Sequence, residues 1–455
     1  MSAEKTMPAL QDPRQAQAFR FVRCGYADGV AELAYAFDDG PELVERVVFP
    51  QAPALPAERR AAFDAALRLL HLVAGVSYYK AGVPARIVVD GWTPDAAAAA
   101  LMDELYLHGL AEFAYRNRLD LRGRIRFPRG GTAGAPATTL HLPRRTLVPI
   151  GGGKDSLVAV EALKRIGEQA TAAWVGRSAL IEACASRTGL PMLNLGRELS
   201  PLLFELNRLG AWNGHIPVTA INSAILACAA LLYGHDTIAF ANERSASSAT
   251  LEYEGQAVNH QWSKGLAFER MFHAYLKSHV AADLHYCSLL RPFSELAVTR
   301  AFARLPQYFD AFSSCNRNFR ILGPRPADRW CGQCPKCHFV FLALAPFLPK
   351  PRLLAIFGRN LLDDDAQTAG FDALMEYRDH KPFECVGEAA EARAAMEALA
   401  QRPEWREDAL VARYREEIRP QILTAQLALE PWLEPSGEHL LPARLSGALD
   451  AIRGA

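Results

Sequence analysis

The chain has 455 residues, half of them hydrophobic, and its 50 basic and 50 acidic side chains give a formal net charge of zero. A chain of this length is expected to form two or three domains with a sizeable core. The balanced charge and the lack of a long basic run argue against nucleic-acid binding. The N-terminus has no continuous apolar segment of the signal-peptide kind, and the longest apolar stretch, residues 218–233, is too short to span a bilayer comfortably. We therefore expect a cytoplasmic globular protein with no nucleic-acid partner and no membrane partner.

Residues 1–140 are predicted to form an α+β domain. Apolar and polar side chains alternate between turns over residues 19–50, which predicts a small antiparallel meander. A helix is expected from about residue 56 to 73 and a strand over 85–90. A second helix is expected to start with Thr93 as its N-cap and Pro94 at its first position. The aperiodic segment 124–145, rich in Gly, Pro, Thr and Arg, places the domain boundary near 140.

Residues 141–350 are predicted to form an α/β domain with a parallel sheet, because short β-like runs alternate with helical patterns. The expected strands are 146–150, 171–175, 192–195 and 237–241, and helices are expected from residue 154 and over 221–232. Ligands bind at the carboxyl ends of such strands, where residues 151 and 242–245 fall. The remainder, residues 351–455, is predicted to be a helical region that packs on the α/β domain, with helices expected over 388–401 and 407–419.

A glycine-rich loop follows the first of these parallel strands. It consists of Gly151, Gly152, Gly153, Lys154, Asp155 and Ser156. Glycines permit positive φ and let backbone N–H groups approach an anion, and the start of the following helix adds its positive dipole end. The spacing fits neither a P-loop nor the dinucleotide-binding fingerprint. We expect a nucleotide phosphate here, and a glycine-rich turn without a ligand is the alternative.

Four of the nine cysteines lie close together in the sequence, at Cys315, Cys331, Cys334 and Cys337. Four thiolates with short C-x2-C steps suit tetrahedral zinc, and a closed set of this kind is structural rather than catalytic. An iron–sulfur cluster also takes four cysteines, and unligated buried thiols are a further possibility. The spacing favours structural Zn²⁺ and leaves these alternatives open.

Residues 151–156 resemble the Ser-Gly-Gly-x-Asp-Ser pyrophosphate loop (PP-loop) of ATP pyrophosphatases, with Gly151 in place of the first serine. Together with the four-cysteine pattern and residues 288–298, the segment 146–345 is similar to the 7-cyano-7-deazaguanine synthase branch of these enzymes. The resemblance implies a parallel-sheet PP-loop core that adenylates a carboxylate and releases diphosphate.

The whole chain is more similar to the UDP-N-acetylmuramoyl-L-alanyl-L-glutamate epimerase family. The resemblance rests on residues 149–156, 214–223, 242–247, 259–264 and 381–387. It implies that the terminal L-Glu of UDP-N-acetylmuramoyl-L-Ala-L-Glu is inverted to D-Glu, in peptidoglycan precursor synthesis, while ATP and Mg²⁺ give AMP and diphosphate. The N-terminal domain, absent from the smaller synthases, is expected to grip the UDP-muramoyl portion. The alternative is another carboxylate-adenylating ATP pyrophosphatase that forms an amide or a nitrile.

The resemblance gives roles to the loop and to the residues after the strand 237–241. Lys154 would neutralise charge on the triphosphate, Asp155 would help to hold magnesium, and Ser156 would donate to a phosphate oxygen. Each also has an ordinary interpretation, as a solvated side chain, a dipole-complementing acid or a helix cap. The expected substrate-binding residues are Asn242, Arg244 and Ser245, since Arg makes bidentate contacts with carboxylates and phosphates.

The candidates for proton transfer at the glutamate α-carbon are Cys385, His260, Lys264 and Glu243. Cys385 would act as a thiolate base if Lys381 or His380 lowers its pKa. Lys264 is also a candidate for binding the carboxylate or diphosphate. A lone cysteine or histidine is more often a packed or merely polar residue, so the alternative role for each is structural.

Overall fold

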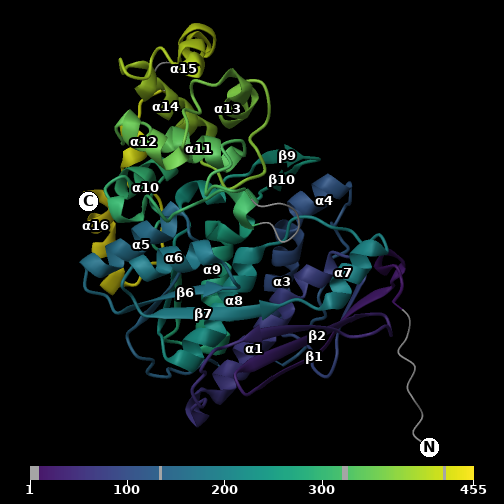
Figure 1. The fold of residues 1–455 in the computed structure, drawn as a ribbon. Coiled ribbons are helices and arrows are strands. Elements are labelled where there is room, and N and C mark those ends of the chain that lie inside the picture. Colours follow the sequence, from purple (N-terminus) through teal and green to yellow (C-terminus); the bar gives the residue numbers. More distant parts are fainter. Residues whose placement is uncertain (1–9, 133–135, 320–325, 424–426, 455) are drawn as a thin grey trace, which may run out of the picture.

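The computed structural model describes residues 10–132, 136–319, 326–423 and 427–454. Within these residues nine strands form one sheet in the order β11-β8-β5-β6-β7-β3-β2-β1-β4 (Figure 1). Their bounds are β1 Ala18–Ala27, β2 Val30–Phe37, β3 Leu43–Val48, β4 Arg86–Val89, β5 Thr146–Pro149, β6 Ala170–Val175, β7 Met192–Glu198, β8 Thr237–Phe240 and β11 His285–Ser288. A separate hairpin consists of β9 (Leu251–Tyr253) and β10 (Gln256–Val258).

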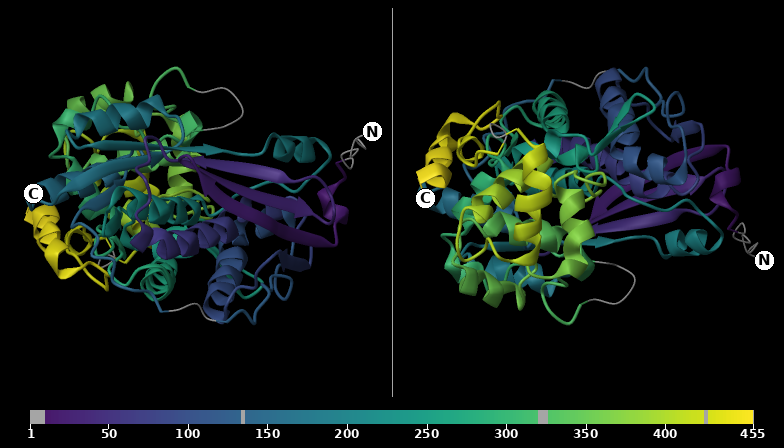
Figure 2. Two further views of the ribbon diagram at one scale, coloured as in Figure 1. Left: turned by 90° about the horizontal axis from the view of Figure 1, so that it is seen from below. Right: turned by 90° about the horizontal axis from the view of Figure 1, so that it is seen from above.

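The sheet has a parallel part and an antiparallel part. Strands β11, β8, β5, β6 and β7 run parallel to one another, which confirms the predicted α/β pattern. Strands β1, β2 and β3 form the predicted antiparallel meander, and β3 pairs antiparallel with β7. Figure 2 shows these N-terminal strands, in purple, continuing the teal strands of the α/β part. The segments on either side of the predicted boundary at residue 140 therefore share one sheet, and the boundary itself stays a prediction.

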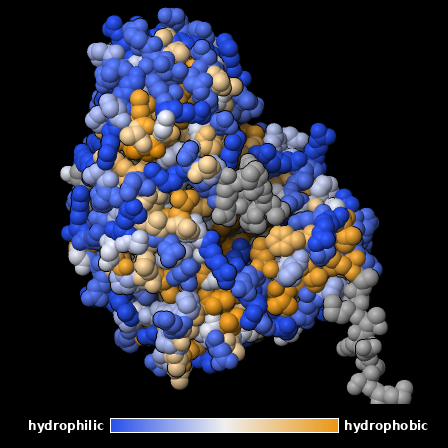
Figure 3. All heavy atoms as spheres, viewed as in Figure 1, coloured by the Kyte–Doolittle hydropathy of each residue, from blue (hydrophilic) through white to orange (hydrophobic). Residues whose placement is uncertain are grey.

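Helices cover the sheet and build the C-terminal region at the top of Figure 1. Their bounds are α1 Arg60–Ala74, α2 Val76–Tyr79, α3 Ala96–Gly109, α4 Ala111–Asn117, α5 Lys154–Arg165, α6 Ala179–Arg187, α7 Pro201–Arg208, α8 Val218–Tyr233, α9 Leu266–Tyr275, α10 Glu295–Phe302, α11 Pro335–Leu344, α12 Lys350–Phe357, α13 Thr368–Leu374, α14 Ala389–Ala400, α15 Ala409–Arg413 and α16 Gly447–Gly454. One apolar cluster surrounds α1 and α8, and a second surrounds α5, α10, α11 and α14. The outer surface of the C-terminal helices is mainly hydrophilic (Figure 3).

The helical segment Ala57–Tyr79 is long and apolar enough to cross a membrane by length and composition. Its most apolar window is 78% buried inside the protein, and its helix α1 packs against α8. The fully buried side chains of Phe63, Leu69 and Leu70 explain the composition. The apolar character of this segment is therefore accounted for by the core.

Two predicted helix boundaries differ from the structure. Helix α3 begins at Ala96, and its N-cap is Asp95, whose carboxylate accepts a hydrogen bond from the Ala98 N–H at 2.8 Å. The prediction of Thr93 as N-cap was therefore wrong, because the acidic side chain two residues later satisfies the free N–H groups. The helix expected over 407–419 is α15 followed by a π-helical turn, Tyr414–Ile418. The expected packing of the tail on the α/β part is confirmed, since α16 contacts α5.

Candidate active site

A cavity of about 530 Å³ lies at the carboxyl ends of β5 and β8. This is the edge at which a parallel sheet binds ligands. The residues that were predicted from the sequence and that line this cavity are Gly151, Gly153, Asp155, Ser156, Asn242, His260, Lys264 and Cys385. Segments far apart in the chain therefore meet around one space.

The glycine-rich loop joins β5 to α5 and forms one wall of the cavity. Gly152 has a φ of +77°, a conformation that favours glycine, and a Cβ on Gly153 would lie 2.8 Å from Ser314 Oγ. The Ser156 hydroxyl accepts from the Gly151 N–H at 3.4 Å and donates to the Gly153 carbonyl at 3.2 Å. No side chain caps the start of α5, so its first N–H groups remain available to an anion.

Lys154 is buried beneath the loop rather than exposed in the cavity wall. Its ammonium contacts Asp155 at 2.5 Å and pairs with Glu295 at the start of α10. Burial disfavours the charged ammonium, but Asp155 and Glu295 together raise the pKa of Lys154 above its ordinary value. Burial likewise opposes ionisation of Asp155, yet Lys154 and Lys336 lower the pKa of its carboxyl. Asp155 is thus the negatively charged member of this group that reaches the cavity.

Cys385 projects into the cavity from the loop between α13 and α14, where Lys264 Nζ donates to its sulfur at 3.1 Å. Burial opposes ionisation of the thiol, but Lys264, His260 and Lys336 hold the pKa of Cys385 well below its ordinary value. The cations that stabilise the thiolate are therefore remote in sequence. Lys381 or His380 was predicted from the sequence to be the cation that lowers this pKa. Neither is among the main charges that do so, and the side chain of His380 is exposed.

His260 lies between Cys385 and Glu112, a carboxylate that is not among the site residues predicted from the sequence. Its Nδ1 is 2.5 Å from Glu112 Oε2, and its ring lines the same cavity as Cys385. Burial disfavours the imidazolium, but Cys385 and Glu112 raise the pKa of His260 to about 9. His215 stands beside it, with the two ring centres 4.3 Å apart. Glu112 lies on α4, and no local spacing signal links it with residue 260.

The residues that follow β8 divide between the cavity and its surroundings. Asn242 lines the cavity, while the Glu243 carboxylate lies behind it and accepts from the Ser245 N–H at 2.5 Å. Burial, with Glu295 and Glu391 nearby, raises the pKa of Glu243 to about 8. Arg244 donates to Ser436 and stacks on Trp432 in the C-terminal region. Of the three predicted substrate-binding residues, Asn242 is the one in the cavity wall.

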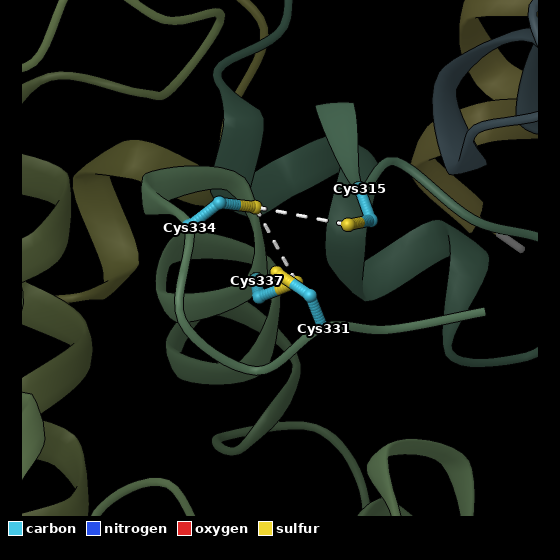
Figure 4. Close-up of side chains that lie close together, drawn as sticks. All are labelled: Cys315, Cys331, Cys334 and Cys337. Atoms are coloured by element: carbon cyan, nitrogen blue, oxygen red, sulfur yellow. Dashed lines mark hydrogen bonds between the residues drawn. The ribbon is translucent and has the colours of Figure 1, made fainter. Parts of the chain in front are cut away.

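The four predicted metal-binding cysteines converge, and Figure 4 shows their sulfurs turned toward one another. Their ligand atoms all lie within 4.8 Å of one another, and the Sγ of Cys334 is 3.9 Å from that of Cys315 and 3.5 Å from that of Cys337. Between these cysteines, Lys336 of α11 reaches the cavity. The Ser313 N–H also donates to the Gly152 carbonyl at 3.0 Å. The segment that leads into Cys315 thus contacts the glycine-rich loop, and a cavity lysine lies between Cys334 and Cys337 in the sequence.

The fold and the cavity define an α/β protein in which a glycine-rich loop and the thiol of Cys385, whose pKa is lowered, line one cavity, with a cysteine cluster nearby. The pattern described as the MurL N-terminal domain matches residues 10–289, and that of the MurL C-terminal domain matches residues 311–428. The chain therefore belongs to the MurL family.

Curated relatives span nearly the whole chain. A protein of Xanthomonas oryzae pv. oryzae (strain MAFF 311018) is 60% identical over 437 residues, which cover 95% of this chain and 97% of the relative. A protein of Salinispora tropica is 41% identical over 96% of this chain and 97% of its own length. One of a Micromonospora species is 41% identical over 96% of this chain and 98% of its own length. All three are named UDP-N-acetyl-alpha-D-muramoyl-L-alanyl-L-glutamate epimerase.

Proposed function

We propose that the chain is an epimerase, and hence an isomerase, that inverts the terminal L-Glu of UDP-N-acetylmuramoyl-L-Ala-L-Glu to D-Glu through an acyl-adenylate. The names of relatives up to 60% identical support the reaction and its place in peptidoglycan precursor synthesis. The observation that carries the mechanism is that one cavity holds both the glycine-rich loop and the Cys385 thiolate. A cytoplasmic location, where nucleotide-linked precursors and ATP are available, remains part of the proposal.

The glycine-rich loop is proposed to bind the phosphates of ATP. The uncapped start of α5 and the backbone N–H groups of residues 152 and 153 suit an anion, and Ser156 lines the same part of the cavity. Asp155 is the ionised carboxylate in this wall, so it fits Mg²⁺, which prefers oxygen ligands and binds together with phosphates. Mg²⁺ supplies charge neutralisation at the phosphates when bound. Lys154 is proposed to act from beneath, by holding Asp155 and the first turn of α5 in place.

Adenylation solves the chemical problem of the reaction. The α-proton of a free carboxylate is hard to remove, because the product would carry two negative charges on one carboxylate. Attack of the substrate carboxylate on the α-phosphate of ATP releases diphosphate and gives an acyl-adenylate with a neutral carbonyl. That carbonyl accepts the charge that develops when the α-proton leaves. Water then cleaves the acyl-adenylate and releases AMP and the inverted product.

Cys385 is proposed to take the α-proton. Its thiolate is stabilised by Lys264 at 3.1 Å and by His260, and it lies in the cavity wall. The α-proton moves to the thiolate, which becomes a thiol, and a solvent-exchangeable proton delivered to the opposite face of the carbon then gives the D configuration. Lys264 and Lys336, both in the wall, are placed to stabilise the negative charge of the intermediate. Glu243, which is buried behind the wall, is a weaker candidate for either transfer.

The four cysteines are proposed to bind one structural zinc ion. Tetrahedral Zn–S bonds of ~2.3 Å separate neighbouring sulfurs by ~3.8 Å. The close pairs here lie 3.5, 3.7 and 3.9 Å apart, which fits a single ion. An iron–sulfur cluster divides its thiolates among several iron atoms and holds them farther apart. A closed set of four thiolates leaves no position for substrate, so its role is to fix Lys336 and the loop at residues 313–315.

The test is incubation of the purified protein with ATP, Mg²⁺ and UDP-N-acetylmuramoyl-L-Ala-L-Glu without any amine. We expect AMP to appear in parallel with D-Glu, measured by chiral analysis of the hydrolysed product. The matched L-Ala compound without glutamate serves as the substrate control. AMP formation that needs ammonia or an amine would contradict the proposal and favour an amide- or nitrile-forming enzyme. Inversion without AMP would contradict the adenylation step.

A further inference from the structure

Glu112, in the N-terminal part of the chain, contacts a residue that lines the active-site cavity. It lies on α4, yet its Oε2 is 2.5 Å from His260 Nδ1, and 148 positions separate the two residues. The side chain of Glu112 is 6% exposed, and that of His260 is 14% exposed. His260 and Cys385 line the same cavity, and the charge of His260 lowers the pKa of Cys385, so the carboxylate, the imidazole and the thiol are neighbours in that order.

The two oxygens of Glu112 have different partners. Arg116, one turn along α4, donates to Oε1 at 2.6 Å, which leaves Oε2 for His260. Burial opposes ionisation, but His260 holds the pKa of Glu112 below its ordinary value, with smaller contributions from His215 and Arg116. A helix-surface ion pair with Arg116 alone would not require a buried carboxylate, which is costly without compensation. The second oxygen is therefore committed to His260.

The contact between Glu112 Oε2 and His260 Nδ1 has the length of a hydrogen bond, not the separation of two ligands of one metal ion. Two ligands of a tetrahedral ion with bonds of ~2.1 Å lie ~3.4 Å apart, which is well beyond the observed separation of 2.5 Å. A carboxylate in this position fixes which imidazole nitrogen carries the proton and stabilises the imidazolium. Burial and the charge of His260 lower the pKa of the adjacent His215 to about 4, so His260 is the positive member of the pair.

We propose that Glu112 is a positioning residue: it holds His260 as an oriented cation so that Cys385 persists as a thiolate. The N-terminal segment then contributes directly to the reaction centre, in addition to any role in binding the UDP-muramoyl group. This inference rests on the proposed function only where it assigns proton transfer to Cys385. The chain of three side chains can be tested without turnover.

The first readout is the rate at which iodoacetamide alkylates Cys385 between pH 5 and pH 10, followed by mass spectrometry of its peptide. Lys264, Lys336 and His260 face the thiol as cations and Glu384 as an acid, while His215 and Arg116 face Glu112; all of these remain in the variants. The variants are Glu112→Gln and Glu112→Asp. The control is Glu104→Gln, which removes a carboxylate from another Glu–His pair, on the exposed face of α3.

We expect Glu112→Gln to raise the pH at which Cys385 becomes reactive by about one pH unit, which is about a tenfold slower reaction at pH values below that midpoint. Glu112→Asp keeps the charge and should restore part of the reactivity, and Glu104→Gln should match the wild type. In turnover, Glu112→Gln should lower kcat more than it changes KM. An unchanged alkylation profile in a Glu112→Gln protein with a wild-type melting temperature would overturn the proposal. A shifted profile with unchanged epimerisation would support the positioning role and contradict Cys385 as the base.

Discussion

Lys264 Nζ lies 3.1 Å from Cys385 Sγ, although 121 positions separate the two residues along the chain. The contact joins the short 3-10 turn Trp262–Lys264 to the loop before α14. It places an ammonium group against a thiol that is otherwise buried, and burial alone would raise the pKa of that thiol. Whether Cys385 is a neutral thiol or a thiolate at neutral pH therefore depends on Lys264 and on the other cations around it.

Replacing Lys264 by Met should make the reaction require a higher pH. The ammonium lowers the pKa of Cys385, so its removal raises that pKa and reduces the thiolate fraction at pH 7. Once the pKa of the thiol exceeds 7, each further rise of one unit in that pKa slows the reaction about tenfold at pH 7. Activity should recover as the pH rises. The measurement is the pH profile of kcat. Lys164→Met, at an exposed site on α5, is the control, and a pH profile whose midpoint stays at the wild-type pH in Lys264→Met would contradict the assignment.

The Gly152→Ala variant should lose affinity for ATP. Gly152 has a φ of +77° in the glycine-rich loop, whereas Gly255 has a φ of +73° in the β9–β10 turn and meets nothing within 4 Å. Alanine costs about 1 kcal/mol in this conformation at either site. Both variants should therefore be destabilised similarly, but only Gly152→Ala should raise the KM for ATP. An equal KM in the two variants would argue against nucleotide binding by the loop.

The Glu295→Gln variant should be strongly destabilised. The side chains of Lys154 and Glu295 are 2% and 3% exposed, so loss of the carboxylate leaves a buried ammonium with Asp155 as its remaining partner. Breaking a buried pair of this kind costs about 3 kcal/mol of unfolding free energy. Urea denaturation is the measurement. Glu205→Gln removes an exposed partner of Arg208 and should have little effect, and equal effects in the two variants would contradict the buried pair.

The Cys337→Ser variant should lose bound zinc. Elemental analysis is expected to find one zinc per wild-type chain, little or none in the variant, and a lower melting temperature. Cys24→Ser, in β1 and away from the cluster, should keep the metal. Because Lys336 precedes Cys337, the variant should also reduce activity at temperatures where it remains folded. Iron and sulfide in place of zinc would contradict the proposed ion.

Ionisation of the buried Glu243 carboxyl should lower the free energy of unfolding as the pH rises. Burial raises the pKa of Glu243 to about 8 and that of Glu391 to about 7. Between the ordinary glutamate pKa and these values, the folded protein retains protons that the unfolded chain releases, so increasing pH favours unfolding. Glu243→Gln should weaken the fall in unfolding free energy between pH 5 and pH 8, whereas the exposed Glu252→Gln should not. Identical pH dependence of the wild type and Glu243→Gln would contradict the protonated carboxyl.

Local patterns predicted the elements well, because the periods of strands and helices are set by short stretches of sequence. The meander β1–β3, the parallel strands β5, β6, β7 and β8 and the glycine turn before α5 followed from such stretches, whereas β11 was not predicted. The four cysteines were also predictable, since their short spacing already suits one metal ion. The start of α3 was not, because two potential capping residues, Thr93 and Asp95, lie close together and the choice depends on which side chain reaches the free N–H groups.

The cavity contacts were harder to predict because they depend on tertiary packing. Cys385, His260 and Lys264 were candidates by residue type, but the partners of the thiol were sought among its neighbours in sequence. The fold instead brings in Glu112 from α4 and turns Lys154 toward Glu295. Arg244, an expected substrate contact, is engaged with Ser436 and Trp432. A single sequence carries no local signal for pairings of this range.

The most direct test of the central claim compares the wild type with Cys385→Ala in heavy water, with ATP, Mg²⁺ and UDP-N-acetylmuramoyl-L-Ala-L-Glu. Substrate-dependent exchange of labelled diphosphate into ATP reports adenylation, and deuterium at the glutamate α-carbon reports proton transfer. We predict that the wild type does both and incorporates one deuterium into the inverted product. Cys385→Ala should keep the diphosphate exchange and lose the deuterium. Deuterium incorporation at the wild-type rate in Cys385→Ala would contradict the account.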